Sequence, residues 1–371
     1  MKVLICGGGT GGHIYPALAV VATLQKNGWT ADNFLWVGTS GQIEEKLVPK
    51  AGIRLETIEG GAIAGVPWSV RLRNLAKLTL SIVKANTIIG NFQPDVLFLT
   101  GGYVNGPLAV AARARGVPAA IYLPDIEPGM AIRYLSRMAE RVACTAADSL
   151  AYFSPGKAIV TGYPVRPELR VATKLNRGDA LRLFDLEPIR QTLFVFGGSR
   201  GARSLNRALM SALPNLLKSI QIIHISGQLD WPEVSDRATE LDGSQRRFYR
   251  PYPYLHDRMG AAYRAANLIV ARAGASMLGE CPAFAVPSIL VPYPHAWRYQ
   301  KINADYLVNQ GAAVRLDDEK LGEELAPTVM ELLADQIRLA EMAHKAQKLD
   351  IPDAVDKLSH VIISLAKRAI S

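Results

Sequence analysis

The sequence predicts an α/β protein in which two doubly wound parallel-sheet domains face each other across a cleft. Short apolar runs alternate with helical patterns along the 371 residues, which is typical of parallel strands joined by helices. A glycine-rich turn follows the first strand of each half, at residues 7–12 and 197–201. The segment 163–167, Tyr-Pro-Val-Arg-Pro, interrupts the pattern, so we predict domains at 1–163 and 164–344.

The first half alternates strands and helices without a break. Strands are expected at residues 2–6, 34–38, 53–58, 95–100, 119–123, 142–145 and 158–162. Helices are expected from residue 14, over 42–51 and 68–90, and after the loops at 101–107 and 124–129. This alternation favours right-handed crossovers between parallel strands.

The second half restarts the same pattern. Strands are expected at residues 192–196, 221–225, around 248–249, 268–271 and 288–291. Two further segments, 272–280 and 292–304, each lead from a strand end into a helix, and helical patterns continue from Leu325. A ligand of such a fold lies outside the carboxyl ends of the strands.

The first turn, Gly7-Gly8-Gly9-Thr10-Gly11-Gly12-His13, presents backbone N–H groups at a helix N-terminus, which favours an anion such as phosphate. The next strand ends without an acidic residue, so a nicotinamide dinucleotide is disfavoured, and no Gly-Lys-Ser/Thr sequence indicates an ATPase. His13 closes the turn, where an imidazole can accept a proton at neutral pH. Packing or capping of the helix start is the alternative, and the turn alone leaves both open.

The composition, 49% hydrophobic and 20% charged, is typical of a soluble globular protein. No run of about eighteen uncharged apolar residues predicts a membrane-spanning helix, and no secretory signal is expected. Cys6, Cys144 and Cys281 lie in apolar stretches without metal-ligand spacing, which indicates a reducing compartment. We therefore expect a cytoplasmic protein without a metal site.

The net charge of +9 favours an anionic partner. Arg73, Lys77 and Lys84 share one face of the helix expected over 68–90. Its apolar face would carry Trp68, Leu72, Leu75, Ile82 and Val83. A second basic stripe is formed by Arg133, Arg137 and Arg141. Such helices lie against anionic lipid headgroups or present a solvated face over an ordinary core, and both interpretations stay open. No aromatic-interleaved basic patch predicts nucleic-acid binding.

Polar residues follow two strands of the second half. Glu280 could bind vicinal sugar hydroxyls through its two oxygens, or serve only as a partner of the helix dipole. The amides of residues 274–276 would favour phosphate. Gln300 and Asn303 lie on one helical face and are either readers of sugar hydroxyls or helix caps.

Six segments, taken together and in order, resemble the MurG family of bacterial glycosyltransferases: 8–16, 101–107, 162–166, 197–206, 272–280 and 300–303. The family moves N-acetylglucosamine from UDP-N-acetylglucosamine onto undecaprenyl-pyrophosphoryl-N-acetylmuramyl pentapeptide, converting lipid I to lipid II in peptidoglycan biosynthesis. The resemblance implies the GT-B fold, with two Rossmann-like domains and an active cleft between them. It also implies a C-terminal helix, here about 345–371, that packs back onto the first domain.

The resemblance further implies residue roles. The donor-binding residues would be Thr10, Gly11, Gly12, Asp125, Arg166, Ser199, Ala275, Ser276, Met277, Leu278, Gly279, Glu280, Gln300 and Asn303. Arg166 and Ser199 would approach the diphosphate, and Glu280 would accept the ribose hydroxyls. Gln300 would read the sugar, and amides near 255–259 would read uracil. Tyr103 and Asn105 would lie on the acceptor side.

The implied reaction is one inverting displacement, in which an acceptor hydroxyl attacks the anomeric carbon as UDP leaves. His13 is our candidate base, with Asp125 or Glu127 as alternatives. No Asp-x-Asp motif is present, so neither a metal nor another cofactor is expected. Because the acceptor's polyprenyl tail stays in the bilayer, we expect peripheral attachment to the anionic cytoplasmic face of the cell membrane.

The sequence departs from the family at three places. Tyr-Leu-Pro-Asp at 122–125 stands where many members carry His-Glu-Gln-Asn, which puts Asp125 in the slot of a donor-contacting Asn. Arg200 and Tyr299 each stand where Gln is common. A related GT-B enzyme with another lipid or small-molecule acceptor is therefore the main alternative. A sugar epimerase and a non-catalytic nucleotide-sugar binding module are the others.

Overall fold

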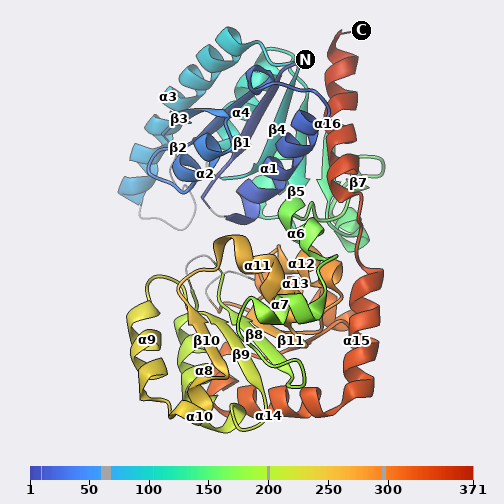
Figure 1. Cartoon of the computed structure of the whole chain (residues 1–371). Helices are drawn as coiled ribbons and strands as arrows, with labels where there is room; N and C mark the ends of the chain where they lie inside the picture. Colours follow the sequence, from blue (N-terminus) through green and yellow to red (C-terminus); the bar gives the residue numbers. More distant parts are fainter. Residues whose placement is uncertain (10, 60–67, 103, 199–200, 295–297, 371) are drawn as a thin grey trace. The chain divides into compact units, whose positions relative to one another are not determined.

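The computed structural model describes residues 1–9, 11–59, 68–102, 104–198, 201–294 and 298–370, without the side chains of 68–78 and 368–370. The chain divides into two compact units (Figure 1). The first unit comprises Met1–Arg166 and Ile351–Ser371, and the second comprises Pro167–Asp350. The boundary predicted from the sequence lies after residue 163, and the returning helix was expected from about residue 345.

The first unit is built on a seven-stranded parallel sheet in the order β3-β2-β1-β4-β5-β6-β7. Its strands are β1 (Val3–Gly7), β2 (Phe34–Thr39), β3 (Arg54–Ile58), β4 (Val96–Gly101), β5 (Ala119–Leu123), β6 (Arg141–Cys144) and β7 (Ala158–Val160). The strand order reverses between β1 and β4, so loops from their carboxyl ends diverge and leave room for a ligand.

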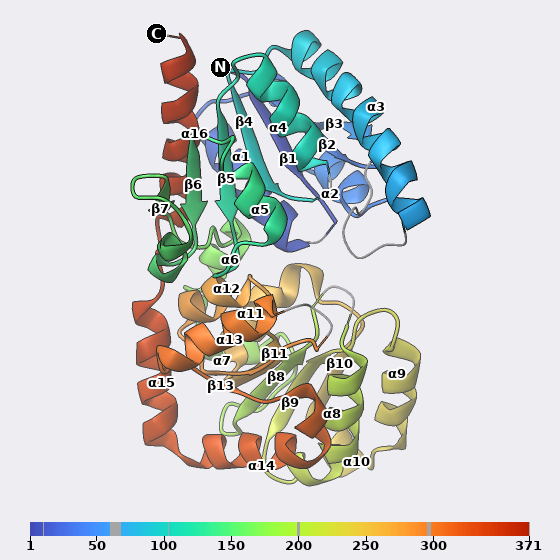
Figure 2. The ribbon, with the colours of Figure 1, turned by 180° about the vertical axis from the view of Figure 1, so that it is seen from behind.

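Helices cover both faces of this sheet (Figures 1 and 2). One face packs against α1 (Gly11–Lys26), α2 (Glu44–Lys50) and the C-terminal helix α16 (Ala354–Ile370). The other face packs against α3 (Trp68–Phe92), α4 (Asn105–Ala114) and α5 (Met130–Leu135). Because both faces are buried, the central strands β1, β4 and β5 are largely apolar runs.

The second unit has a six-stranded parallel sheet in the order β10-β9-β8-β11-β12-β13. Its strands are β8 (Thr192–Phe196), β9 (Gln221–Ile225), β10 (Tyr249–Tyr252), β11 (Leu268–Arg272), β12 (Ser288–Val291) and β13 (Ala313–Arg315). Its helices are α6 (Pro167–Ala172), α7 (Arg177–Arg182), α8 (Arg203–Leu216), α9 (Trp231–Glu240), α10 (Gly243–Arg246), α11 (Met259–Ala265), α12 (Met277–Phe284), α13 (Tyr299–Asn309), α14 (Leu321–Ala334) and α15 (Gln336–Lys348). The strand order reverses between β8 and β11.

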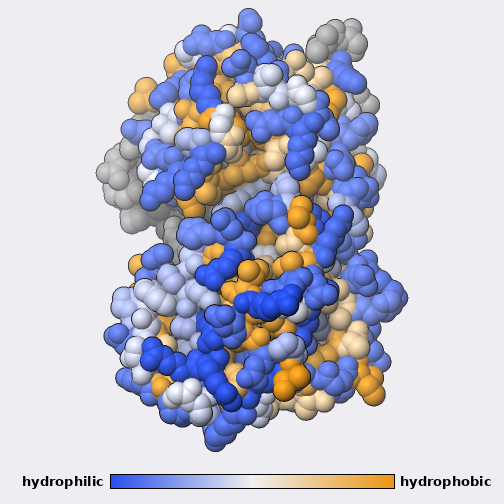
Figure 3. All heavy atoms as spheres, viewed as in Figure 1, coloured by the Kyte–Doolittle hydropathy of each residue, from blue (hydrophilic) through white to orange (hydrophobic). Residues whose placement is uncertain are grey.

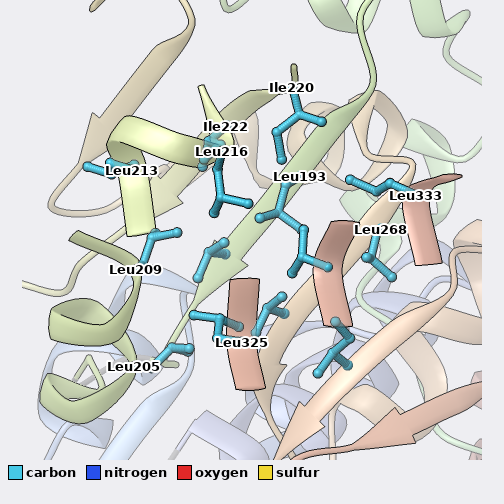
Figure 4. Packing of buried hydrophobic residues seen from close by; sticks show 14 of the residues in the cluster. Leu193, Leu205, Leu209, Leu213, Leu216, Ile220, Ile222, Leu268, Leu325 and Leu333 are labelled. Carbon is cyan, nitrogen blue, oxygen red and sulfur yellow. The ribbon is translucent and has the colours of Figure 1, made fainter. Parts of the chain in front are cut away.

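The packing of α8 explains its amphipathic sequence. Leu205, Leu209, Leu213 and Leu216 recur at helical spacing and are buried against Leu193 of β8 and its neighbours (Figure 4). Leu325 of α14 packs into the same cluster. The second sheet therefore has its own hydrophobic core.

The predicted fold class of two doubly wound parallel α/β domains is confirmed. Two expectations about basic helices were wrong. α5 ends at Leu135 and Arg141 begins β6, so Arg133, Arg137 and Arg141 do not form a stripe on one helix. Val83 is 62% exposed beside Lys84 rather than on the apolar face of α3. The core side of α3 instead carries Ala85, Ile88, Ile89 and Phe92.

Candidate active site

His13 lies in the first turn of α1 and is held from two sides. Its Nδ1 is 3.1 Å from the carbonyl oxygen of Gly8. A carbonyl only accepts, so Nδ1 carries the hydrogen of the neutral ring and Nε2 carries the lone pair. Thr100 Oγ1 donates to the main-chain oxygen of His13 at 2.6 Å. A Cβ on Gly101, whose φ is +131°, would come within 2.7 Å of the His13 ring, so glycine is needed there.

A fully buried carboxylate lies against the first turn. Glu44, at the start of α2, accepts hydrogen bonds from the backbone N–H of Gly9 at 3.1 Å and of Thr39 at 3.0 Å. A Cβ on Gly8 would come within 2.1 Å of Glu44 Oε1. In the described part of the chain no ion pair neutralises this carboxylate. The amide of Gly9 is thus already bound to an internal anion, which disfavours a phosphate at that position.

Arg166 lies near the start of α1. Its guanidinium carbon is 4.5 Å from the centroid of the Tyr15 ring. A Cβ on Gly11 would come within 2.9 Å of the same ring, and Gly12 follows in the first turn of the helix. The structure therefore brings together three of the predicted donor-binding residues and His13 in the first unit.

Asn105 begins α4, after the glycine turn that ends β4. The residue is only 3% exposed, and its Oδ1 has no hydrogen-bond partner among the described residues. A buried acceptor without a donor is costly, and Asn105 follows the carboxyl end of β4, the edge of the sheet at which ligands of such folds bind.

The loop after β5 holds the two alternative bases. Glu127 is 3% exposed and pairs with Arg133 Nη2 at 2.8 Å, so its charge is already neutralised. Asp125 is half-buried. Burial raises the pKa of Tyr122, and its hydroxyl lies 2.8 Å from Thr145 Oγ1. The Tyr122 phenol is therefore a neutral, structural group.

The second glycine turn lies between β8 and α8. A Cβ on Gly197 would come within 2.4 Å of the amide nitrogen of Ala202. Gly201 has a φ of +78°, and a Cβ there would come within 2.4 Å of the carbonyl oxygen of Ser226. No side-chain cap is present at Ala202, the N-cap residue of α8. The first N–H groups of α8 are therefore suited to an anionic ligand.

Glu280 lies in α12 and is oriented by a buried tyrosine. Tyr263 donates its hydroxyl to Glu280 Oε2 at 2.5 Å, and the Tyr263 ring stacks on Phe284 at 5.0 Å. The side chains of Met277 and Leu278 are buried, so a sugar-nucleotide donor could contact only their main-chain atoms. The remaining predicted residues of this segment lie at the start of α12 or just before it: Ala275, Ser276 and Gly279.

The carboxyl ends of β11 and β12 are tied to neighbouring segments. Arg272 is 9% exposed and donates to Asp318 Oδ1 at 2.5 Å and to Ser204 Oγ at 2.7 Å. Asn303 Nδ2 donates to the carbonyl oxygen of Ala273 at 3.2 Å, which fixes the turn after β11. Gln300 Oε1 accepts from the backbone N–H of Tyr293 at 2.8 Å.

Several predicted residues lie outside the described residues: Thr10, Tyr103, Ser199 and Arg200, together with the side chains of Arg73 and Lys77. Among the residues that the structure describes, no group of three or more His, Cys, Asp or Glu could hold a metal ion. None of the described helices is long and apolar enough to cross a membrane.

Sequence reasoning missed two features of the site. Glu44 and Glu45 open a helix, which is the ordinary place for acidic residues, so nothing marked Glu44 as buried. His224 lies between two isoleucines in the strand Gln-Ile-Ile-His-Ile, and a polar residue so placed is a signal of a buried hydrogen-bonded group.

Two family models match the chain. One, described as the glycosyltransferase family 28 N-terminal domain, matches residues 3–144. The other, described as the glycosyltransferase family 28 C-terminal domain, matches residues 192–358.

Relatives match over the full length. A protein of Desulforamulus reducens, named UDP-N-acetylglucosamine--N-acetylmuramyl-(pentapeptide) pyrophosphoryl-undecaprenol N-acetylglucosamine transferase, is 38% identical over 99% of this chain and 100% of its own. A protein of the same name from Thermodesulfovibrio yellowstonii is 35% identical over the same shares.

Solved structures agree with the fold. The crystal structure of Acinetobacter baumannii MurG matches with a TM-score of 0.77 and 27% identity, over 98% of this chain and 99% of that one. UDP-GlcNAc 2-epimerase from Neisseria meningitidis matches with a TM-score of 0.68 at 15% identity, over 99% of this chain and 100% of that one, which is a likeness of fold alone.

Proposed function

The chain belongs to glycosyltransferase family 28, and from this premise we propose that it transfers N-acetylglucosamine from UDP-N-acetylglucosamine to undecaprenyl-pyrophosphoryl-N-acetylmuramyl pentapeptide. The observation that carries this function is the full-length match, at 38% identity, to an enzyme whose name states that donor and acceptor. The reaction converts lipid I to lipid II in peptidoglycan biosynthesis.

The donor would bind to the second unit. The N-terminus of α8, whose N-cap residue Ala202 makes no side-chain hydrogen bond, supports a place for its diphosphate, because helix N-termini stabilise anions. Glu280, oriented by Tyr263, would accept the two ribose hydroxyls. Gln300 and the main chain of residues 275–279 would complete the site, with Asn303 holding the turn after β11.

His13 would act as the general base. Its Nε2 takes the proton of the attacking acceptor hydroxyl, whose oxygen bonds to the anomeric carbon of N-acetylglucosamine. The bond from that carbon to the diphosphate oxygen breaks, and its electron pair leaves with UDP. The hydrogen bond from Nδ1 to Gly8 supports this role, because it directs the lone pair to Nε2. Glu127 is less suited, since Arg133 already neutralises it.

The acceptor would bind to the first unit. The position of Asn105 after the carboxyl end of β4 supports a place near the acceptor. Arg166, Gly11 and Gly12 lie near the same end of α1 as His13, and their contribution to donor binding stays a prediction, as does that of Asp125.

Membrane association of the first unit is supported by a surface formed by α3, α4 and α5. These helices lie side by side over one face of the first sheet (Figure 2). Their exposed apolar side chains are Leu80, Val83, Val110, Met130 and Tyr134. Lys84 and Arg113 add positive charge on α3 and α4. Apolar side chains with neighbouring cations fit an anionic lipid surface, so we place the protein at the cytoplasmic face of the cell membrane.

Liposome flotation tests this attachment. Replacing Leu80 and Val83 with Ser should reduce binding to anionic liposomes about 30-fold or more, since each apolar side chain contributes roughly 1–2 kcal/mol when buried. Neutralising Arg73, Lys77 and Lys84 should reduce it further and flatten its dependence on salt. Replacing Ile337, which is 76% exposed on α15 of the second unit, is the matched control and should change nothing. Equal binding by all variants would leave an ordinary solvated face.

The activity assay combines purified protein with labelled UDP-N-acetylglucosamine and a lipid I analogue. Formation of the lipid-linked disaccharide is the expected result. Isomerised sugar would identify an epimerase. Transfer to another acceptor only would identify a related transferase, and binding without turnover would identify a sugar-nucleotide binding module. Each of those three outcomes would contradict the proposal.

A further inference from the structure

A chain of polar side chains lies beneath the second glycine turn. Its members come from α8, β9, β10 and the residue before α9: Arg203, Asn206, His224, Asp230 and Tyr249. Asn206 and His224 are at most 1% exposed, and Asp230 is 5% exposed. None of these residues is a predicted donor contact. Polar groups so deeply buried are kept only where their hydrogen bonds are made.

The amide of Asn206 is fully used. Its Nδ2 donates to the carbonyl oxygen of Ser226 at 2.9 Å and to Asp230 Oδ2 at 2.8 Å, which takes both amide hydrogens. Its Oδ1 can only accept and lies 3.0 Å from His224 Nε2. His224 therefore presents a hydrogen at Nε2, and this hydrogen fixes which way the amide points.

The other nitrogen of His224 agrees with this assignment. Nδ1 lies 2.7 Å from the hydroxyl of Tyr249, which can donate to it. Burial lowers the pKa of His224 to about 3, so the ring is neutral and needs one donor nitrogen and one acceptor nitrogen. At the far end of the chain, Arg203 Nε donates to Asp230 Oδ1 at 2.9 Å and balances its charge.

The amide orientation determines the position of the turn. Ser226 follows β9, and its carbonyl oxygen accepts a hydrogen bond from Asn206. A Cβ added to Gly201 would lie 2.4 Å from this oxygen. If the amide of Asn206 flipped, its oxygen would face this carbonyl and the Asp230 carboxylate, and the carbonyl would lose its restraint. The close approach between Gly201 and residue 226 thus depends on Asn206.

We infer that His224 is a positioning residue for donor binding, because it fixes Asn206, the Ser226 carbonyl and, through them, the glycine turn at the start of α8. This inference rests on the proposed binding of the donor diphosphate at that turn. Nothing in the inferred role requires His224 to touch the donor.

The test measures the affinity of the full chain for UDP by titration calorimetry. His224→Leu should raise the dissociation constant about tenfold or more, because the amide of Asn206 is released. His224→Gln, whose amide can still donate to Asn206 Oδ1, should restore most of the affinity. In the transferase assay the KM for the donor should rise while kcat changes less than twofold. Tyr249→Phe is a milder change and should lower the affinity for UDP about threefold. This variant replaces His224→Leu in the test if His224→Leu does not fold.

Gln221→Leu is the matched control. Gln221 lies on the same strand as His224, is equally buried, and donates to Glu187 and Thr192 at the other end of β9. Its replacement should lower stability without changing UDP affinity. Equal UDP affinity of His224→Leu, Tyr249→Phe and the unaltered chain would overturn the inference alone. Failure of the unaltered chain to bind UDP would overturn the donor assignment as well, and a matching loss in Gln221→Leu would reduce His224 to a structural role.

Discussion

The two glycine turns, one after β1 and one after β8, resemble each other in sequence and differ in what holds them. The first turn rests on the buried carboxylate of Glu44, which takes the amide of Gly9. In the second turn, Gly201 lies against the main-chain carbonyl of Ser226, which accepts a hydrogen bond from the neutral amide of Asn206. A buried anion repels a second anion, whereas the second turn leaves the helix N-terminus to a ligand. A glycine pattern thus predicts a turn, and its neighbours determine the ligand.

Exposed apolar side chains are found on both units. On the first unit they include Leu80 and Val83 of α3, and on the second unit they include Leu229 and Ile337; apolar areas lie among hydrophilic ones on the visible face of each unit (Figure 3). In the proposed reaction the first unit handles the lipid-linked acceptor and supplies the base, and the second unit holds the nucleotide. Substitutions should therefore separate acceptor chemistry from donor affinity.

The largest expected effect comes from His13. His13→Ala should lower turnover by about 10² or more, because the attacking hydroxyl loses its base. UDP affinity should stay within twofold of the unaltered value, since the nucleotide belongs to the second unit. Steady-state kinetics and titration calorimetry measure the two quantities. His360→Ala, an exposed histidine of α16, is the control. Turnover near normal in His13→Ala would exclude His13 as the base.

Glu280 should show the opposite pattern. Glu280→Gln should lower the affinity for UDP about 10- to 100-fold, because the neutral amide cannot make the charge-assisted hydrogen bonds of the carboxylate to the ribose. Tyr263→Phe, which removes only the hydroxyl that orients this carboxylate, should have a smaller effect in the same direction. Deoxyuridine diphosphate should bind equally to the Glu280→Gln variant and to the unaltered chain if the 2′-hydroxyl is the main contact. A retained preference for UDP in the variant would refute the ribose assignment.

Alanine at the two turns would sharpen the contrast. Gly8→Ala should lower the free energy of unfolding by about 1–3 kcal/mol through its clash with Glu44, and adding Glu44→Ala should relieve part of that loss. The methyl group of Gly201→Ala clashes with a main-chain oxygen, so no side-chain replacement should restore the lost stability. This variant should also bind UDP more weakly.

Gly156→Ala is the control for these glycines, because its φ is +75° and nothing lies within 4 Å of the added Cβ. It should cost only about 1 kcal/mol, the penalty of the left-handed conformation. Chemical denaturation measures these variants and Glu44→Ala alone. Additive losses in the Gly8→Ala, Glu44→Ala pair would show that Glu44 does not obstruct the added methyl group.

The stability of the folded chain should decrease gradually in acid because of His224. His224 has a folded pKa of about 3, below the ordinary 6.5, so the unfolded chain binds a proton that the folded chain rejects. Stability should therefore fall as the pH drops from about 6.5 toward 3, by at most about 1.4 kcal/mol per pH unit from this group. His224→Gln should remove this part of the slope, measured by denaturation between pH 4 and 7.5. An unchanged slope would contradict a neutral buried ring.

Much of the fold was predictable because strands buried on both faces are continuous apolar runs, as in Val3–Gly7 and Leu268–Arg272. The short strand Ala313–Arg315 was missed, since an edge strand of three residues carries little periodicity. The helix expected to carry Arg137 ended early, because the chain enters β6 at Arg141. Tertiary packing, not local pattern, determined that boundary.

The candidate site was predictable only in part. Glycine turns and His13 have local signatures, so their positions at strand ends could be read from the sequence. The buried role of Glu44 and the link between Asn206 and His224 depend on residues that meet only in the folded chain. Sequence spacing carries no information on such long-range partners.

Helix α16 has a consequence for how the protein is made. Its Leu358, Ile362 and Leu365 complete the core over α1, although they follow the whole second unit in the sequence. The second unit is one continuous stretch and can fold during translation, whereas part of one face of the first sheet stays uncovered until α16 has been synthesised. A nascent chain stalled before Ala354 would therefore expose that apolar face to chaperones and proteases.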